Sequence, residues 1–164
     1  MSKLLHYTCL CTLIAAGVSA QVIPAPTVET SGMVGLAFGE TARLNVLNPG
    51  VPAPATAAAC TAAVSFIDAG GNVLKSTTLT IAPGTSMSFD LRSDTDLDLT
   101  IAERREIRAT LTIPPLPPST SSTPAAGGCI YVKTLEVFDN ASLRTLVVLG
   151  HFRDVTAPAT TEAP

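Results

Sequence analysis

Apolar and polar residues alternate along the middle of the chain, which is the pattern of a β-strand with one buried face. The run at residues 104–113 is the clearest, because Ile107, Ala109 and Leu111 alternate there with charged or hydroxyl side chains. Residues outside the first twenty show no convincing helical period. Eight strands are expected, near residues 33–37, 41–48, 60–67, 73–81, 86–91, 104–113, 129–138 and 145–150.

Turn-forming residues separate these runs. Asp68–Asn72, Ala82–Thr85 and Asp139–Arg144 each supply Gly, Pro, Asn or Asp between two apolar stretches. Short strands at this spacing predict an antiparallel sandwich or a barrel. The apolar phase slips along Ile130–Val137, which predicts a β-bulge near Lys133 and Thr134.

One short phrase occurs twice. "LAFGETARLNV" (Leu36–Val46) is echoed by "IAPGTSMSFDL" (Ile81–Leu91). In each copy a glycine, Gly39 or Gly84, precedes a hydroxyl residue and an alternating strand. Each copy is therefore expected to form a hairpin corner of one domain. An ancient duplication is the alternative explanation.

The segments "GETARLNVLNPG", "AAVSFIDAGGNVL" and "LTIAPGTSMSFDL" together resemble bacterial immunoglobulin-like or fibronectin-III-like modules of the adhesion-related CARDB type. The resemblance covers Gly39–Leu91. It implies a non-catalytic extracellular module for binding, spacing or assembly, and it transfers no ligand and no site residue. With the strand pattern, it gives the expected fold class: an all-β, antiparallel immunoglobulin-like β-sandwich of about seven to eight strands with one disulfide.

The first twenty residues read as a secretory signal peptide. Lys3 supplies the positive charge, an apolar run follows, and Val18-Ser19-Ala20 supplies the small residues of a cleavage site. A transmembrane anchor is the alternative, but the apolar run is too short to span a bilayer. We expect residues 21–32 to be an extended N-terminal segment, 33–153 the sandwich domain and 154–164 a disordered Thr/Pro/Ala tail. The expected location is outside the cytoplasm: extracellular, on the cell surface or in the periplasm.

Removal of this leader would take Cys9 and Cys11 and leave Cys60 and Cys129. Two cysteines in an oxidising compartment most simply form one disulfide. A metal thiolate or a reactive thiol is the alternative, but neither cysteine has a nearby histidine or Cys-x-x-Cys spacing. A proline-rich stretch precedes each cysteine, and both stretches are expected to be exposed loops.

The charge of the chain argues against nucleic acid and against anionic membranes as partners. The full sequence carries a formal net charge of −3, and only 14% of its residues are charged. Catalytic residues are also scarce. His151 is the one histidine beyond the leader, and although Asp154 and several serines exist, no Gly-x-Ser-x-Gly motif is present. The sequence therefore predicts no enzyme, no catalytic residue and no cofactor.

Three polar clusters are candidate sites. Asp94, Asp96 and Asp98 have the spacing that opens a calcium loop, but Leu99 and Arg105 stand where an EF-hand needs Gly and Glu. They form a weak calcium candidate, with an amphipathic edge as the alternative. The arginine-rich cluster Glu103–Arg108 suits the solvated face of a strand, or less well a receptor for an anion. Asn140-Ala141-Ser142 is a formal glycosylation sequon.

The expected function is binding, adhesion or extracellular assembly through an unidentified protein or glycan at the cell surface, with no membrane anchor after leader removal. The alternative is a structural subunit of an extracellular polymer. In that case Gln21–Thr30 would add a strand to the edge of a neighbouring copy, giving a homo-oligomer. A hydrolase or carbohydrate-active enzyme is a weaker alternative.

Overall fold

The computed structural model describes residues 25–50, 59–115 and 129–155, and these residues form strands and turns without a helix. The described residues do not include the expected signal peptide. They also leave out nearly all of the tail and most of both proline-rich stretches, including most of Pro114–Pro118. The ten strands are β1 (Thr27–Ser31), β2 (Val34–Ala37), β3 (Glu40–Leu47), β4 (Cys60–Asp68), β5 (Val73–Ile81), β6 (Ser86–Arg92), β7 (Arg104–Ile113), β8 (Val132–Asp139), β9 (Thr145–Leu149) and β10 (Phe152–Asp154).

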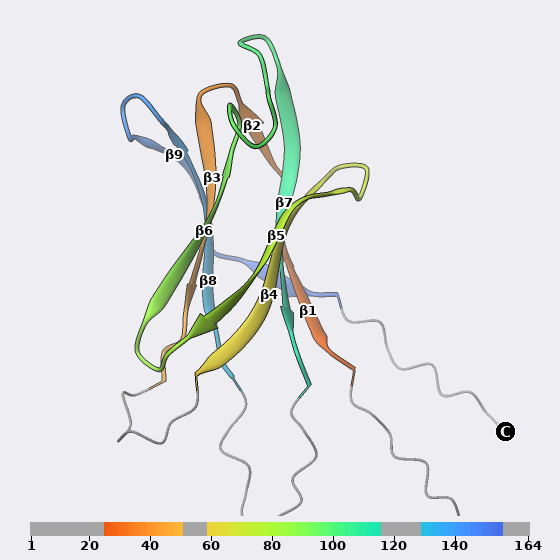
Figure 1. Ribbon diagram of the computed structural model, residues 1–164, viewed down its shortest axis with the longest axis vertical. Coiled ribbons are helices and arrows are strands. Elements are labelled where there is room, and N and C mark those ends of the chain that lie inside the picture. The colour runs from red at the N-terminus through yellow and green to blue at the C-terminus, as the bar shows by residue number, and fades with distance from the viewer. Residues whose placement is uncertain (1–24, 51–58, 116–128, 156–164) are drawn as a thin grey trace, which may run out of the picture.

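The strands form two antiparallel sheets that lie face to face (Figure 1). The first sheet has the order β10-β1-β7-β4-β5, with β2 also paired to β7. The second has the order β6-β3-β8-β9. The expected all-β antiparallel sandwich is confirmed, and eight of the ten strands lie where alternation predicted them. The two additional strands are β1 and β10, which pair with each other.

Both copies of the repeated phrase are corners that carry the chain from the first sheet to the second. The expectation that each copy is a hairpin is wrong, because the two strands that each corner joins lie in different sheets. The first copy joins β2 to β3 and the second joins β5 to β6. Gly39 and Gly84 have φ values of 80° and 73°, a region that glycine enters without strain. The two strands that follow these corners pair with each other, and Leu44 lies opposite Phe89.

The core lies between the inward faces of the two sheets. Phe66 of β4 and Phe89 of β6 meet across the interior with ring centroids 5.3 Å apart in a stacked arrangement. Ile107, Ala109 and Leu111 of β7 are fully buried, as their alternation predicted. The largest fully buried apolar side chains are Phe66, Leu36, Leu44, Ile81, Leu91, Ile107, Leu111, Leu135, Val46, Val64 and Val137.

The predicted bulge at Lys133 and Thr134 is wrong. The pairing of β8 with β3 runs without a shift from Val132 to Asp139. The apolar pattern slips because Lys133 itself faces inward, opposite the buried Val46, whereas Ile130 and Val132 are exposed. The ammonium of Lys133 forms an ion pair with the carboxylate of Glu29 on β1 of the other sheet.

The N-terminal segment differs from its expected description, because Thr27–Ser31 is an integral strand of the sandwich. It pairs with β7 on one side and β10 on the other. Glu29 lies opposite the buried Leu111, so its side chain faces the interior and meets Lys133 there. Apolar alternation could not reveal this strand, because a glutamate occupies its inward position.

The disulfide joins the two sheets at one end of the sandwich. Cys60 opens β4 in the first sheet, and Cys129 precedes β8 in the second. The two sulfurs are 2.02 Å apart and the two Cα atoms 5.7 Å apart. The predicted pairing of Cys60 with Cys129 is confirmed, and it closes a loop with a sequence separation of 69 residues.

Removing this bond should lower the free energy of unfolding substantially. A Cys60→Ala, Cys129→Ala double variant should lose about 4 kcal/mol, because the unfolded chain regains the freedom of a long closed loop. Urea unfolding followed by circular dichroism, with and without a reducing agent, measures the loss. Reduction should destabilise the native protein and leave the double variant unchanged. An unchanged midpoint in the reduced native protein would contradict this expectation.

The ion pair between the sheets should show coupling in a double-variant cycle. Lys133→Met or Glu29→Gln alone should each cost about 1–3 kcal/mol, because each leaves a largely buried polar partner without its counterpart. The double variant should cost less than the sum of the two single changes. Arg104→Met with Glu106→Gln, an exposed pair, is the matched control and should show little coupling. Additive effects at Lys133 and Glu29 would contradict the pairing.

Candidate functional site

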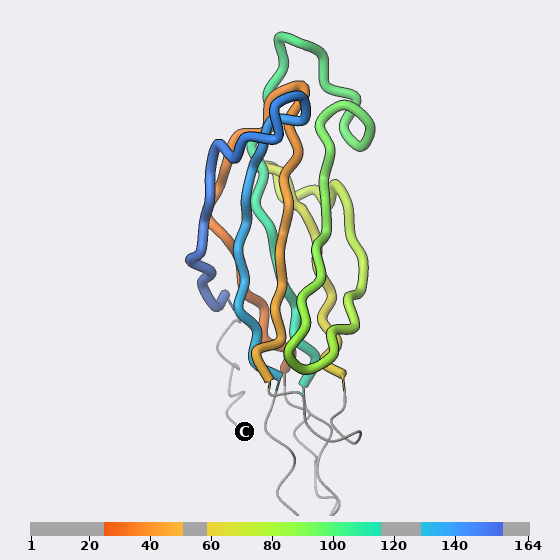
Figure 2. The backbone as a smooth tube through the Cα atoms, turned by 90° about the vertical axis from the view of Figure 1, so that its left-hand side faces the viewer, coloured from red at the N-terminus to blue at the C-terminus, as the bar shows by residue number. Residues whose placement is uncertain are grey.

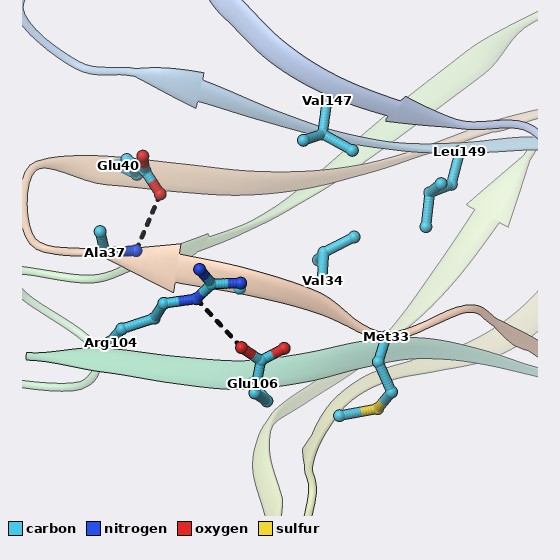
Figure 3. Close-up of a pocket in the computed structure, with 9 residues that line it drawn as sticks. Met33, Val34, Ala37, Glu40, Arg104, Glu106, Val147 and Leu149 are labelled. Atoms are coloured by element: carbon cyan, nitrogen blue, oxygen red, sulfur yellow. Dashed lines mark hydrogen bonds and ion pairs between the residues drawn. The ribbon is translucent and has the colours of Figure 1, made fainter.

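On one side of the sandwich, an open depression separates the edges of the two sheets. Here β2 of the first sheet and β9 of the second run along the two rims of an apolar depression of about 390 Å³ (Figure 3). Met33 and Val34 line it from the first sheet, and Val147 and Leu149 line it from the second. In Figure 2 the same two segments lie along one side of the molecule. We call this depression the β2–β9 groove.

The groove continues along β9 past Leu149. A second depression is lined by Ser31 and Gly32 on one wall and by Val148, Gly150, His151 and Arg153 on the other, and Leu149 belongs to both. Its far end is closed where the chain crosses from β9 to β10, since β10 pairs with β1 in the first sheet. The whole feature is therefore an elongated cleft that follows the direction of β9.

Charged residues stand at the rim of the groove and are engaged with neighbours. Arg104 Nε lies 3.0 Å from Glu106 Oε1 (Figure 3). The Arg104 guanidinium lies against Gly35, where a Cβ would come within 1.8 Å of Nε, so a side chain at this site on β2 would require the exposed Arg104 side chain to move. Glu40 Oε2 accepts a hydrogen bond from the backbone N–H of Ala37 at 2.8 Å. The groove is thus bordered by the Arg104–Glu106 ion pair and by a Glu40 carboxylate that accepts a backbone hydrogen bond.

The outermost strands of the sandwich differ in charge. β5 carries Lys75, β6 carries Asp90 and Arg92, and β10 carries Arg153 and Asp154. In contrast, β9 reads TLVVL and β2 reads VGLA, and neither contains a charged residue. Leu146 and Val148 are 49% and 60% exposed. Native proteins commonly place charges on edge strands to block pairing with other chains, and the two strands beside the groove lack that protection.

The histidine considered for catalysis lies in this region without the geometry of a triad. His151 is exposed and shares the second depression with Ser31. The Ser31 hydroxyl donates to the carbonyl of Gly32 at 2.8 Å and accepts from the N–H of Ala109 at 2.9 Å. It therefore joins β1 to β7, which is a structural role. Asp154 lies on β10 opposite Glu29.

The aspartates of the calcium candidate lie in and around the turn after β6, where Asp96 binds groups of the protein itself. Asp96 Oδ2 accepts hydrogen bonds from Lys75 Nζ at 2.7 Å and from the N–H of Arg92 at 2.8 Å. Asp94 Oδ1 lies 3.6 Å from Arg92 Nε, and Asp98 has a φ of 51°. In the described part of the chain, no three Asp, Glu, His or Cys side chains converge in a way that could hold a metal ion.

The arginines of Glu103–Arg108 are spread over β7 and do not form one anion receptor. Arg104 pairs with Glu106 beside the groove, and Arg105 lies 3.9 Å from Asp68 at the β4–β5 turn. Glu103 caps the preceding turn, since its Oε2 accepts from the N–H of Thr100 at 2.7 Å. Mixed charge on the solvated face of a strand, the first interpretation, describes this arrangement.

The sequon at Asn140 is held in the β8–β9 turn. Its Oδ1 accepts a hydrogen bond from the Thr41 hydroxyl at 2.6 Å, and its Nδ2, the atom to which a glycan is joined, is buried. Asp139 organises the same turn by accepting from the N–H and the hydroxyl of Ser142, both at 2.6 Å. Asn140 therefore acts here as an anchor for the turn.

Comparison with known proteins gives no relative: no family model, no curated protein and no solved structure matches this chain. The described residues contain no helix of the length and apolarity needed to cross a membrane. The chemistry of the chain must therefore be argued from its own residues.

Sequence reasoning did not find the β2–β9 groove, although a signal for it was present. "TLVVL" at residues 145–149 breaks the alternation that marks a half-exposed strand, because apolar residues fall on both of its faces. Such a run is normally buried on both sides. In this sandwich β9 is an outermost strand, so half of that apolar surface faces solvent.

Acid should destabilise the turns of the sandwich. Hydrogen bonds from the side chain and the N–H of Asn72 lower the pKa of Asp68, and hydrogen bonds from Ser142 lower the pKa of Asp139. Burial tends to raise the pKa of Asp96, but the Arg92 N–H and the Lys75 ammonium lower it by more. A folded-state pKa below the unfolded value of about 3.9 means that the stability is complete above that pH and is lost as pH falls through the folded pKa.

We therefore expect the urea midpoint to be level near neutral pH and to fall as the pH drops below about 4. Asp68→Asn should be less stable at neutral pH and should show a shallower decline in acid, since one of the titrating turns has lost its carboxylate. Ser76→Asn, an exposed change on β5, is the control and should follow the native profile. Identical acid profiles for native protein and Asp68→Asn would contradict the assignment.

Proposed function

We propose that this protein is a non-catalytic module that acts outside the cytoplasm by binding and assembly, and that its binding surface is the β2–β9 groove. The ligand we favour is an extended polypeptide strand added to the outer edge of β9. The observation that carries the proposal is the uncharged, apolar, solvent-exposed edge of β9 beside an apolar cleft.

Strand addition fits the chemistry of this edge. β9 pairs with β8 on one side, and among the described residues no strand pairs with its other side. The outer edge of such a strand offers N–H and C=O groups that a partner can satisfy, and main-chain hydrogen bonds then supply affinity without requiring a special sequence. Lys75, Asp90 and Arg153 make the other outermost strands less suitable.

The groove adds side-chain specificity to this main-chain pairing. Val147 and Leu149 lie opposite Val137 and Leu135, so they face the interior of the sandwich. Alternate side chains of a strand placed beside β9 would point the same way and would contact Met33 and Val34 across the groove. An apolar residue at those positions would lose water-exposed surface, at about 25 cal/mol for each Å² of apolar area buried.

The disulfide supports a site of action outside the cytoplasm, because such bonds form and persist in oxidising compartments. The expected leader at residues 1–20 agrees with this. Adhesion and assembly remain the two processes that such a module would serve, with a surface protein as partner.

The pairing of β1 argues against the first alternative, a polymer built by donation of Gln21–Thr30. Thr27–Ser31 is paired on both sides within its own sheet, and Glu29 holds Lys133. Donation of this segment would break both ladders and the ion pair between the sheets. Addition of a strand to the outer edge of β9 would break no strand pairing of the described residues.

Strand binding can be tested by amide hydrogen exchange with a defined probe. The probe is an uncharged synthetic peptide of alternating valine and threonine, and its N-methylated form is the control. We expect the probe to slow exchange in residues 145–149 and, more weakly, in 34–37, while β5 is unchanged. The N-methylated peptide cannot form the ladder and should have no effect. Unchanged exchange in β9 at saturating probe would contradict the proposal.

A further inference from the structure

The strand that β9 accepts is, we infer, β9 of a second copy of this chain. This inference rests on the proposed function, because it names the partner of the same groove. Pairing two β9 strands would join their sheets into one continuous sheet across a two-fold axis.

The regular part of β9 is short and well defined. Val147 pairs with Val137, but Thr145 pairs with Phe138, which leaves Leu146 as an extra residue in β9. The bulge at Leu146 interrupts the strand there. Regular backbone is left at Val147, Val148 and Leu149, so Val148 is the centre about which two copies can pair antiparallel.

This register places the inward-facing residues of one copy opposite inward-facing residues of the other. With Val148 opposite Val148 of the second copy, Val147 of each copy lies opposite Leu149 of the other. Val147 and Leu149 both face the interior, and Val148 faces outward with Glu136, which it pairs on β8. The apolar interior therefore continues from one sandwich to the next without a change of face, as a sheet with one buried side requires.

The same register avoids opposed charges. The paired residues Val147, Val148 and Leu149 are all uncharged, so no charged residue meets another within the paired segment. Self-pairing about Lys75 on β5 or Asp90 on β6 would set two like charges directly opposite each other, which destabilises a ladder. β9 contains no charged residue, so none of its registers can oppose like charges, whereas β5 and β6 each have registers in which like charges meet.

Besides the hydrogen bonds between the two β9 strands, a second copy would bury apolar side chains that line the groove. Met33 is 42% exposed and Val147 38%, although both line the groove at the margin of the core. A two-fold axis at β9 brings the grooves of both copies to the same interface. Such an interface is self-complementary and closes at two copies, whereas strand donation from one copy to the next would give an open polymer.

The test is the molar mass of the exported protein in solution, measured by sedimentation equilibrium from micromolar to millimolar concentration. We expect the native chain to approach twice its monomer mass. Val148→Lys should halve that mass, because two ammonium groups would meet with Cβ atoms about 5 Å apart. Thr78→Lys, an exposed change on the β5 edge, is the matched control and should remain a dimer.

A second variant keeps the test decisive if Val148→Lys fails to fold, which circular dichroism reports. Val148→Cys should form a covalent dimer under mild oxidation, because the two Cβ atoms are close enough for a disulfide, and Thr78→Cys should not. A native chain that stays monomeric at millimolar concentration overturns the inference, as does a dimer unaffected by Val148→Lys and not linked by Val148→Cys. A monomer whose β9 is still protected by the valine–threonine peptide leaves the proposed function standing, and a monomer without that protection contradicts both.

Discussion

The apolar interior between the two sheets has to be kept from water, and most of the structure follows from how the chain does this. The chain crosses from the first sheet to the second at Gly39 and again at Gly84. The strands that follow these two corners, β3 and β6, pair with each other in the second sheet. The disulfide holds the layers together at one end. On the side of β10 the chain itself crosses over and pairs with β1. Beside β2 and β9 the margin of the interior is open as a groove, and that is where an external strand would act as a cover.

The interior also contains a polar contact that apolar packing alone would not require. Lys133 and Glu29 come from opposite sheets and face each other at inward positions. A pair of this kind adds little net stability compared with two apolar residues, because both groups lose water, but each group is costly without the other. It therefore favours one alignment of β1 against β8. A shift of either strand by one residue would turn its charged side chain outward and leave the other charge unpaired. The pair thus holds in place the strand that the polymer hypothesis would have donated.

Much of this fold could be predicted from the sequence, because most strands obey a simple rule of one wet and one buried face. Ile107, Ala109 and Leu111 are fully buried as their alternation predicted, and Cys60 pairs with Cys129. The prediction failed where an inward position holds a charge. The phase slip predicts a β-bulge near Lys133 and Thr134, and residues 21–32 are expected to be an extended segment before the sandwich, because a single sequence does not reveal that a lysine and a glutamate far apart in the chain will meet. The groove escaped prediction for a different reason: which strands are outermost depends on the order of pairing, and alternation carries no information about that order.

The contrast between the edges is the strongest reason to look for a partner at β9. Val147 and Leu149 are held in line by their pairing with β8, and Val148 is exposed beside them. A protein with an apolar edge of this kind risks indiscriminate association, and a single lysine would remove the risk at little cost to the fold. The chain has such charges on β5, β6 and β10. Their absence at β9 coincides with the bulge at Leu146, which limits the regular edge to three residues and with it the registers that another strand can adopt. An edge that is both uncharged and restricted in this way is suited to one specific pairing rather than to unlimited growth.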